Sequence, residues 1–161
     1  MDSIKDVEQR IIATLDHLEE YSIKLKDVKS FIFLGKCEYK AIAMEAALKM
    51  NELSYVPSLA YSLGSLKHGP LGLIDKDVVV VLLDADDRYR TDIRICKEQL
   101  KSRKAVAITD LDKFSDRNSY PSLINMIYTA IQCQLLAYHV AKRLGRDIDK
   151  PRHLAKSVTV K

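Results

Sequence analysis

The chain has 161 residues, of which 47% are hydrophobic and 30% are charged, and its formal net charge is +4. This length fits one domain, because domains commonly contain roughly 100–200 residues, and the composition is too apolar for a disordered chain. The modest charge is spread along the sequence without a clustered basic face. The sequence therefore argues against nucleic acid as a partner and is compatible with a small anionic ligand.

The three cysteines are far apart and odd in number, which predicts neither a disulfide framework nor a zinc site. A reducing, cytoplasmic location is the expectation that follows. The N-terminus is charged from Asp2 onward, so we expect no signal peptide. The longest apolar run, at 78–83, is too short to span a bilayer, and we expect no membrane partner.

Hydrophobic periodicity predicts helices and strands that alternate along the chain. Apolar residues at three- and four-residue spacing from Ile4 to Leu18 predict a first helix, and short apolar blocks bounded by charged residues or Gly predict buried strands. Gly145 stands where a C′ glycine would end the last helix. The expected elements are a helix to about residue 26, a strand at 31–34, a helix at 39–53, a strand at 56–61, turns at 62–72, a strand at 78–83, a helix at 87–102, a strand at 105–109, a loop at 115–121 and a helix at 122–144.

Strands that alternate with helices imply βαβ crossovers and a largely parallel sheet. We therefore predict one α/β domain over 1–161, a three-layer α/β/α sandwich of the flavodoxin-like kind, in which 146–161 form a C-terminal tail. Met44, Ala47, Leu48 and Tyr55 are the expected apolar stripe of the helix at 39–53. Ligands of such folds lie beyond the carboxyl ends of the strands, so the turns after Leu34, Tyr61 and Leu83 are the expected places for a site.

Glu45, Lys49 and Glu52 share one face of the predicted helix, because they are spaced i, i+4, i+7. A Glu followed four residues later by a Lys is an ordinary surface ion pair worth about 0.3–0.5 kcal/mol, and the spacing alone favours that interpretation. The alternative is a carboxylate base and an ammonium group, held together by a rigid helix for proton abstraction next to a carbonyl.

Three further side chains could carry chemistry. His68 lies in a Lys-His-Gly-Pro turn that presents the imidazole as a general acid or base, although most exposed histidines have no such role. Lys156 lies among small and apolar residues, where an amine could form a Schiff base with a ketose or simply snorkel from a packed terminus. Cys37, at a predicted helix start, is either a reactive thiol or a small buried filler.

Two stretches resemble a known family and together cover almost the whole chain. The first begins with Met-Glu-Ala-Ala-Leu-Lys-Met-Asn-Glu-Leu-Ser-Tyr at 44–55 and continues to the Leu-Lys-His-Gly-Pro turn at 66–70. The second runs from Gln-Leu-Leu-Ala-Tyr-His-Val at 134–140 to the ending Leu-Ala-Lys-Ser-Val-Thr-Val at 154–160. Both resemble the second sugar-isomerase (SIS) subdomain of the glutamine–fructose-6-phosphate aminotransferase (glucosamine-6-phosphate synthase) family.

The resemblance implies the synthesis of glucosamine 6-phosphate from fructose 6-phosphate and glutamine, in hexosamine biosynthesis, and it implies a role for each candidate residue. It implies no metal and no cofactor. By position, Glu52 matches the base that moves a proton between sugar C1 and C2, and Lys49 matches a nearby active-site lysine. His68 matches the ring-opening histidine, which in the family comes from the neighbouring subunit. Lys156 matches the tail lysine that engages the sugar carbonyl, and Glu45 and Ala155 match the adjacent substrate contacts.

The resemblance covers only part of a family member. The glutaminase domain and the first SIS subdomain, whose Ser/Thr-rich loop grips the sugar phosphate, have no counterpart in this sequence. We therefore expect this chain to be the C-terminal half of an isomerase, which needs a phosphate-binding SIS partner and a glutaminase. We also expect the chain to form a homodimer and not to complete the full reaction alone. Residues 114–132 depart from the family pattern where an edge strand is found, and Cys37 replaces a Gly.

Two other interpretations stay open at this point. One is a non-catalytic SIS module that dimerises or binds a sugar phosphate without turnover. The other is a remnant without function. The residues alone do not decide among the three, because the acid–base groups are present while the phosphate-binding loop has no counterpart.

Overall fold

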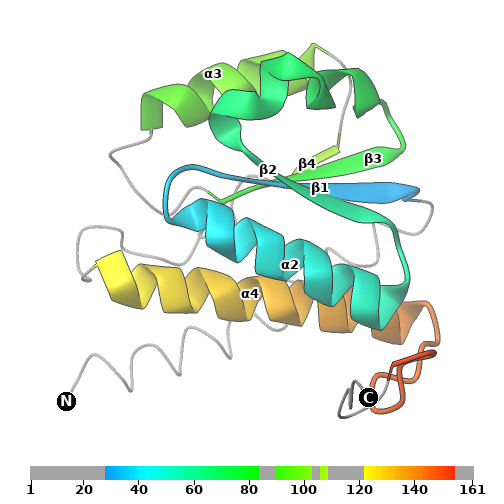
Figure 1. Ribbon diagram of the computed structural model, residues 1–161. Helices are drawn as coiled ribbons and strands as arrows, with labels where there is room; N and C mark the ends of the chain where they lie inside the picture. Colours follow the sequence, from blue (N-terminus) through cyan, green and yellow to red (C-terminus); the bar gives the residue numbers. More distant parts are fainter. Residues whose placement is uncertain (1–27, 84–89, 103–105, 109–121, 155–161) are drawn as a thin grey trace, which may run out of the picture.

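The computed structural model describes residues 28–83, 90–102, 106–108 and 122–154. A parallel sheet lies at its centre (Figure 1), with the strand order β2-β1-β3-β4. The strands are β1 (Ser30–Gly35), β2 (Ser58–Ser62), β3 (Val78–Leu82) and β4 (Val106–Ile108). The predicted strands and their parallel arrangement are confirmed, with ends that differ by one or two residues.

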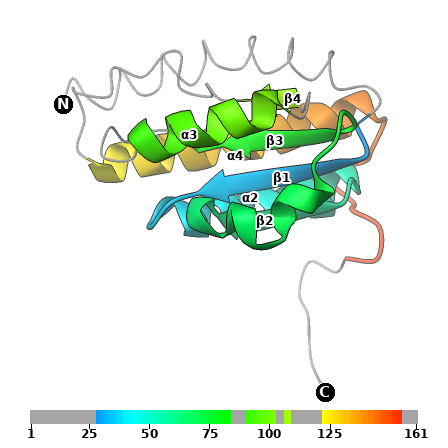
Figure 2. The ribbon, with the colours of Figure 1, turned by 90° about the horizontal axis from the view of Figure 1, so that it is seen from above.

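Helices cover both faces of the sheet, which confirms the predicted three-layer sandwich. One face carries α2 (Tyr39–Ser54), which lies beneath β1 and β2 (Figure 2), and α4 (Ser122–Arg143), which packs beside α2. The other face carries α3 (Arg90–Lys101) and two short 3-10 helices, η1 (Leu63–His68) and η2 (Pro70–Leu73). The helix predicted before residue 27 and the segment at 109–121 lie outside the described residues.

The central strands are apolar on both sides because each side contacts a different helix layer. In β1, Phe31 and Phe33 belong to the core shared with α2 and α4, whereas Ile32 and Leu34 belong to the core shared with α3 and η1. All four side chains are buried. An unbroken hydrophobic run is therefore the expected sequence of such a strand.

The stripe predicted for α2 is right for Ala47 and wrong for Met44 and Leu48, and Tyr55 lies just past the end of the helix with a partly buried side chain. The Met44 and Leu48 side chains are 57% and 48% exposed, whereas Ala47 is buried. The buried face consists mainly of small side chains, which let the helix approach the sheet and α4 closely. Its members are Tyr39, Ile42, Ala43, Ala46, Ala47, Met50 and Ser54.

The end of α4 confirms the predicted role of Gly145. Its φ is +65°, a left-handed conformation that a glycine adopts without a Cβ penalty. The Gly145 N–H donates to the Lys142 carbonyl at 3.1 Å, and the Arg146 N–H donates to the Ala141 carbonyl at 3.0 Å. These two bonds form a Schellman motif, which ends the helix and turns the chain into the tail.

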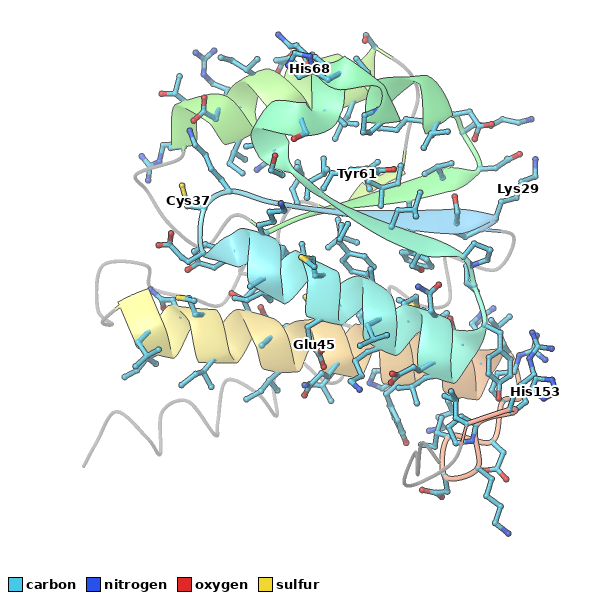
Figure 3. All side chains as sticks on the ribbon, in the orientation of Figure 1. Lys29, Cys37, Glu45, Tyr61, His68 and His153 are labelled. Carbon is cyan, nitrogen blue, oxygen red and sulfur yellow. The ribbon has the colours of Figure 1, made fainter. Side chains whose placement is uncertain are left out.

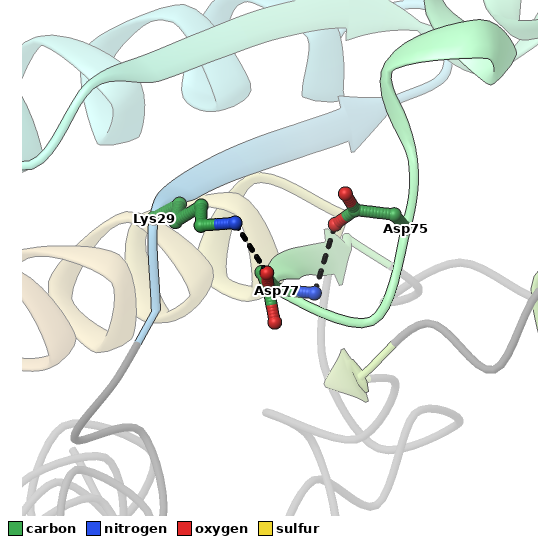
Figure 4. Close-up of polar contacts among 3 residues, drawn as sticks. All are labelled: Lys29, Asp75 and Asp77. Atoms are coloured by element: carbon green, nitrogen blue, oxygen red, sulfur yellow. Dashed lines mark hydrogen bonds and ion pairs between the residues drawn. The ribbon is translucent and has the colours of Figure 1, made fainter.

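The amino edge of the sheet is held by contacts between the starts of β1 and β3 (Figure 4). Lys29 Nζ lies 2.5 Å from Asp77 Oδ2, and the Lys29 N–H donates to the Asp77 carbonyl at 2.9 Å. The Asp77 N–H in turn donates to Asp75 Oδ1 at 2.8 Å.

Among the described helices, none is both long enough and apolar enough to cross a bilayer.

Candidate functional site

The three charged side chains predicted to share one face of α2 do lie together. Lys49 Nζ donates to Glu52 Oε2 at 2.8 Å and lies 3.7 Å from Glu45 Oε1. All three side chains are partly buried. The group thus places one ammonium between two carboxylates, on a rigid helix.

Lys49 remains positively charged in this setting. The hydrogen bond from Lys49 to Glu52 raises the pKa of the amine, slight burial lowers it, and the charges of Glu52 and Glu45 raise it further. The result is a pKa above the ordinary value of 10.5. At neutral pH the ammonium can therefore hold the Glu52 carboxylate in one orientation through a charge-assisted hydrogen bond.

Glu52 lies at the wall of a cavity of about 490 Å³. The cavity is a shallow groove, largely open to solvent, and not an enclosed chamber. The cavity lies where the tail passes the C-terminal end of α2. Its lining residues are Asn51, Glu52, Tyr55, Pro57, Arg152 and Leu154.

The tail reaches the cavity that the predicted base lines. The Arg152 N–H donates to the Tyr55 hydroxyl at 2.8 Å, and Leu154 lines the cavity together with Glu52. Ala155 and Lys156, the two tail residues predicted to act at the site, lie outside the described residues. The structure therefore brings the described end of the tail to the cavity that Glu52 lines, and the positions of Ala155 and Lys156 stay predictions.

His68 lies on the other side of the sheet from the acidic helix face. It ends η1, is exposed, and is well separated from Glu45 (Figure 3). A single copy of the chain does not bring the imidazole to Glu52. The role that the resemblance implies for His68, in which the histidine comes from a neighbouring subunit, stays a prediction.

Sequence reasoning identified only Glu52 among the lining residues of the cavity and missed the other five, which are Asn51, Tyr55, Pro57, Arg152 and Leu154. Asn51 brackets the start of β2, since its Nδ2 donates to the Ser58 carbonyl at 3.0 Å and its Oδ1 accepts the Ser58 N–H at 2.8 Å. Tyr55 and Arg152 are 97 positions apart and meet only through the fold. A local sequence pattern does not reveal such a long-range contact. Asn51 could have been predicted as a site residue, because it directly precedes Glu52 in the sequence.

The cavity is not at the sheet edge that the fold rule favours. α2 runs antiparallel to the strands, so Glu52 near its C-terminus lies toward the amino edge (Figure 1). A second cavity, of about 250 Å³, does lie at the carboxyl ends, next to Lys36 after β1. There the Lys36 ammonium forms an ion pair with Asp92 of α3. The prediction from strand ends thus points to a different cavity from the one beside Glu52.

Comparison with known proteins places this geometry in a family. A SIS domain model matches residues 24–141. An isomerizing glutamine–fructose-6-phosphate aminotransferase of Thermosynechococcus vestitus is 35% identical over 171 aligned positions, which cover 99% of this chain and 26% of that enzyme. The chain spans about a quarter of the length of the curated relatives it matches, 26% in the first three.

Solved structures agree with this assignment. The C-terminal domain of glucosamine-fructose-6-phosphate aminotransferase from Francisella tularensis matches with a TM-score of 0.75 and 28% identity, over 92% of this chain and 46% of that one. Glucosamine-6-phosphate deaminase from Thermotoga maritima shares the fold, with a TM-score of 0.81 and 24% identity over 99% of this chain and 50% of that one. The predicted resemblance is confirmed, and the chain belongs to the SIS domain family.

Proposed function

We propose that this chain carries the acid–base groups that convert a ketose imine derived from fructose 6-phosphate into glucosamine 6-phosphate. The observation that carries the proposal is the Lys49–Glu52 pair, with a 2.8 Å hydrogen bond, at the edge of a cavity that the tail reaches. Relatives named for this transformation support the substrate class.

The chemistry requires a base near C1 and C2 of an opened sugar, together with groups that stabilise the developing oxyanion. Glu52 removes the proton from C1 and returns a proton to C2, so that C1 becomes the aldehyde carbon and C2 carries the amine. Lys49 orients Glu52 and lends positive charge to the site. In this proposal His68 opens the ring, Lys156 engages the sugar carbonyl, and Glu45 and the Ala155 backbone contact the substrate.

The proposed reaction needs partners. A second copy would supply His68, because that side chain lies across the sheet from α2, the helix that carries Glu52 (Figure 3), so we propose a homodimer. A phosphate-binding SIS unit and a source of ammonia from glutamine would complete the site, since the chain spans about 26% of the length of the relatives it matches. We place the reaction in the cytoplasm, where Cys37, Cys96 and Cys133 would stay free thiols.

The proposal is tested by following hydrogen exchange at the sugar. The full chain is mixed with a first-SIS partner from a relative and glucosamine 6-phosphate in D₂O, and NMR measures deuterium entering C1 and C2. We expect exchange with the wild-type chain and a loss of at least about 100-fold with Glu52→Gln, because the base is removed. The matched control is Glu98→Gln, which removes a carboxylate with the same i, i+3 lysine pairing on α3, at 3.3 Å from Lys101.

A binding module without turnover is the second candidate, because the family model that matches the chain is a SIS domain and specifies no reaction. Calorimetry with fructose 6-phosphate and glucosamine 6-phosphate, with and without the partner, separates the two functions. Binding by the wild-type chain without any hydrogen exchange would support the module. Hydrogen exchange that Glu52→Gln abolishes would support the isomerase.

A further inference from the structure

Tyr55 has a backbone conformation that bulky residues rarely adopt. It follows α2 directly, with φ +61° and ψ +17°. A residue that ends a helix in this left-handed region is usually a glycine, since a Cβ is disfavoured there. For a bulky side chain such a φ is an outlier, and outliers of this kind gather at functional positions. The aromatic side chain at this position therefore calls for a role that a glycine could not fill.

The ring of Tyr55 meets the tail in three ways. Its hydroxyl accepts the Arg152 N–H at 2.8 Å. The Arg152 guanidinium carbon lies 4.3 Å from the ring centroid, and that of Arg146 lies 5.2 Å from it. Both distances fall inside the roughly 6 Å range of cation–π attraction. One side chain at the end of α2 thus contacts both the start and the later part of the described tail.

Between these two contacts the tail is braced by its own turns. Asp147 Oδ1 accepts the N–H groups of Asp149 at 3.0 Å and Lys150 at 3.1 Å. Farther on, the Leu154 N–H donates to the Pro151 carbonyl at 3.4 Å. The described tail therefore has a fixed course from the end of α4 to the cavity beside Glu52.

We propose that Tyr55 is a positioning residue that holds tail residues 146–154 across the C-terminal end of α2. Held there, the chain leaves Leu154 at the wall of the cavity that Glu52 also lines. The catalytic meaning of this arrangement rests on the proposed function. The holding of the tail does not, because it concerns only contacts among described residues.

Limited trypsin digestion of the full chain tests the holding of the tail without any sugar present. Trypsin can cut after Arg146 and Arg152, whereas Lys150 precedes a proline and resists cleavage. We expect Tyr55→Leu to raise the cleavage rate at these sites by at least about 10-fold, because cleavage follows the population of open tail. Tyr61→Leu, a partly buried tyrosine on the other side of the sheet, is the matched control and should leave the rate unchanged.

Tyr55→Phe separates the ring from the hydroxyl and guards against a misfolded leucine variant. It keeps the cation–π contacts and loses only the acceptor, so we expect a rise of roughly 2- to 10-fold in cleavage and in hydrogen exchange of the Arg152 amide. A merely structural role for Tyr55 would give the phenylalanine and leucine variants cleavage rates that follow their melting temperatures. Wild-type cleavage rates in Tyr55→Leu, or an equal rise in Tyr61→Leu, would overturn the proposal.

The sugar exchange assay adds the link to the site. With the tail released in Tyr55→Leu, we expect kcat to fall by at least about 10-fold while KM changes less, because remote positioning acts on the reacting geometry. An unchanged kcat in a variant whose tail is cleaved rapidly would refute the positioning role. Absence of exchange in the wild-type chain would count against the proposed function, and the trypsin result would still decide whether Tyr55 holds the tail.

Discussion

Gly35, the last residue of β1, lies directly against the backbone of Tyr39 at the start of α2. A Cβ placed on Gly35 would lie 2.1 Å from the Tyr39 carbonyl oxygen and 2.4 Å from its carbonyl carbon. The contact is with backbone and not with a flexible side chain, so the turn itself would have to move. We expect Gly35→Ala to lower the free energy of unfolding by about 1–3 kcal/mol, as overpacking commonly does.

Urea denaturation measures this effect, and Gly72→Ala is its control. A Cβ at Gly72 meets nothing within 4 Å, so that variant should stay within about 0.5 kcal/mol of the wild type. Equal stability of the two variants would show that the β1–α2 turn has room that the structure does not indicate.

Lys49→Met should separate stability from activity. The Lys49 side chain is 32% exposed, and partly exposed ion pairs contribute only about 0–1 kcal/mol, so the melting temperature should change little. If Lys49 orients Glu52 and lends charge to the site, the sugar exchange rate should fall by roughly 10- to 1,000-fold. Lys101→Met, which removes the partner of Glu98 on α3, is the control. If Lys49→Met lowers the melting temperature enough for unfolding to account for the loss of exchange rate, the result would argue against a catalytic role.

The Lys29–Asp77 pair predicts a dependence of stability on pH. The hydrogen bond from Lys29 lowers the pKa of Asp77 below its ordinary 3.8, burial opposes this, and the Lys29 charge adds to it. The stabilisation is therefore fully present above the unfolded pKa and is lost as the pH falls through the lower folded pKa. The pKa of Lys29 is raised by the same pair, so its contribution is lost only as the pH rises above 10.5 and through the folded pKa.

Urea midpoints of the wild type and Asp77→Asn between pH 2 and 7 measure this difference. We expect the two curves to separate near neutral pH and to converge in acid, because protonation removes the same interaction as the substitution. Asp149→Asn, which changes an exposed tail carboxyl, should run parallel to the wild type. Curves for Asp77→Asn that stay equally far apart at pH 2 would contradict the assignment.

The cysteines predict the pattern of thiol labelling. Cys37 is exposed, whereas Cys96 and Cys133 are buried, and burial raises the pKa of the Cys96 thiol to about 11. Because the thiolate is the reactive form, Ellman's reagent at pH 8 should label one thiol quickly in the native chain and all three after unfolding. Cys37→Ser should remove the fast phase, and Cys133→Ser should keep it.

Local sequence patterns were sufficient for the sheet and for the end of α4. An apolar, mostly β-branched run between charged residues, such as 78–83, is typical of a strand covered on both faces, and Gly145 occupies a position that favours a left-handed helix end. The buried face of α2 was harder to predict. Alanines are only weakly hydrophobic, so the pattern predicts the larger Met44 and Leu48 as the buried face, although these two side chains are exposed.

The candidate site was predictable only in the part that lies on one helix. The i, i+4, i+7 spacing placed Glu45, Lys49 and Glu52 together, and the hydrogen bond from Lys49 to Glu52 agrees with it. The contact between Tyr55 and Arg152 joins residues far apart in the chain, and the packing of the whole fold decides it. The contact between Tyr55 and Arg152 is therefore visible only in the three-dimensional structure, and the same holds for the position of the cavity near the amino edge.

The sheet between His68 and the acidic face of α2 has a consequence for genetics. If one reaction centre uses a carboxylate from one molecule and an imidazole from another, two separately inactive variants can restore each other in a mixture. Random pairing of Glu52→Gln with His68→Ala chains leaves half of the pairs mixed, each with one complete centre of two, so roughly a quarter of wild-type turnover should return. Dilution to a chain concentration below the dissociation constant of the dimer would then abolish turnover without unfolding either molecule.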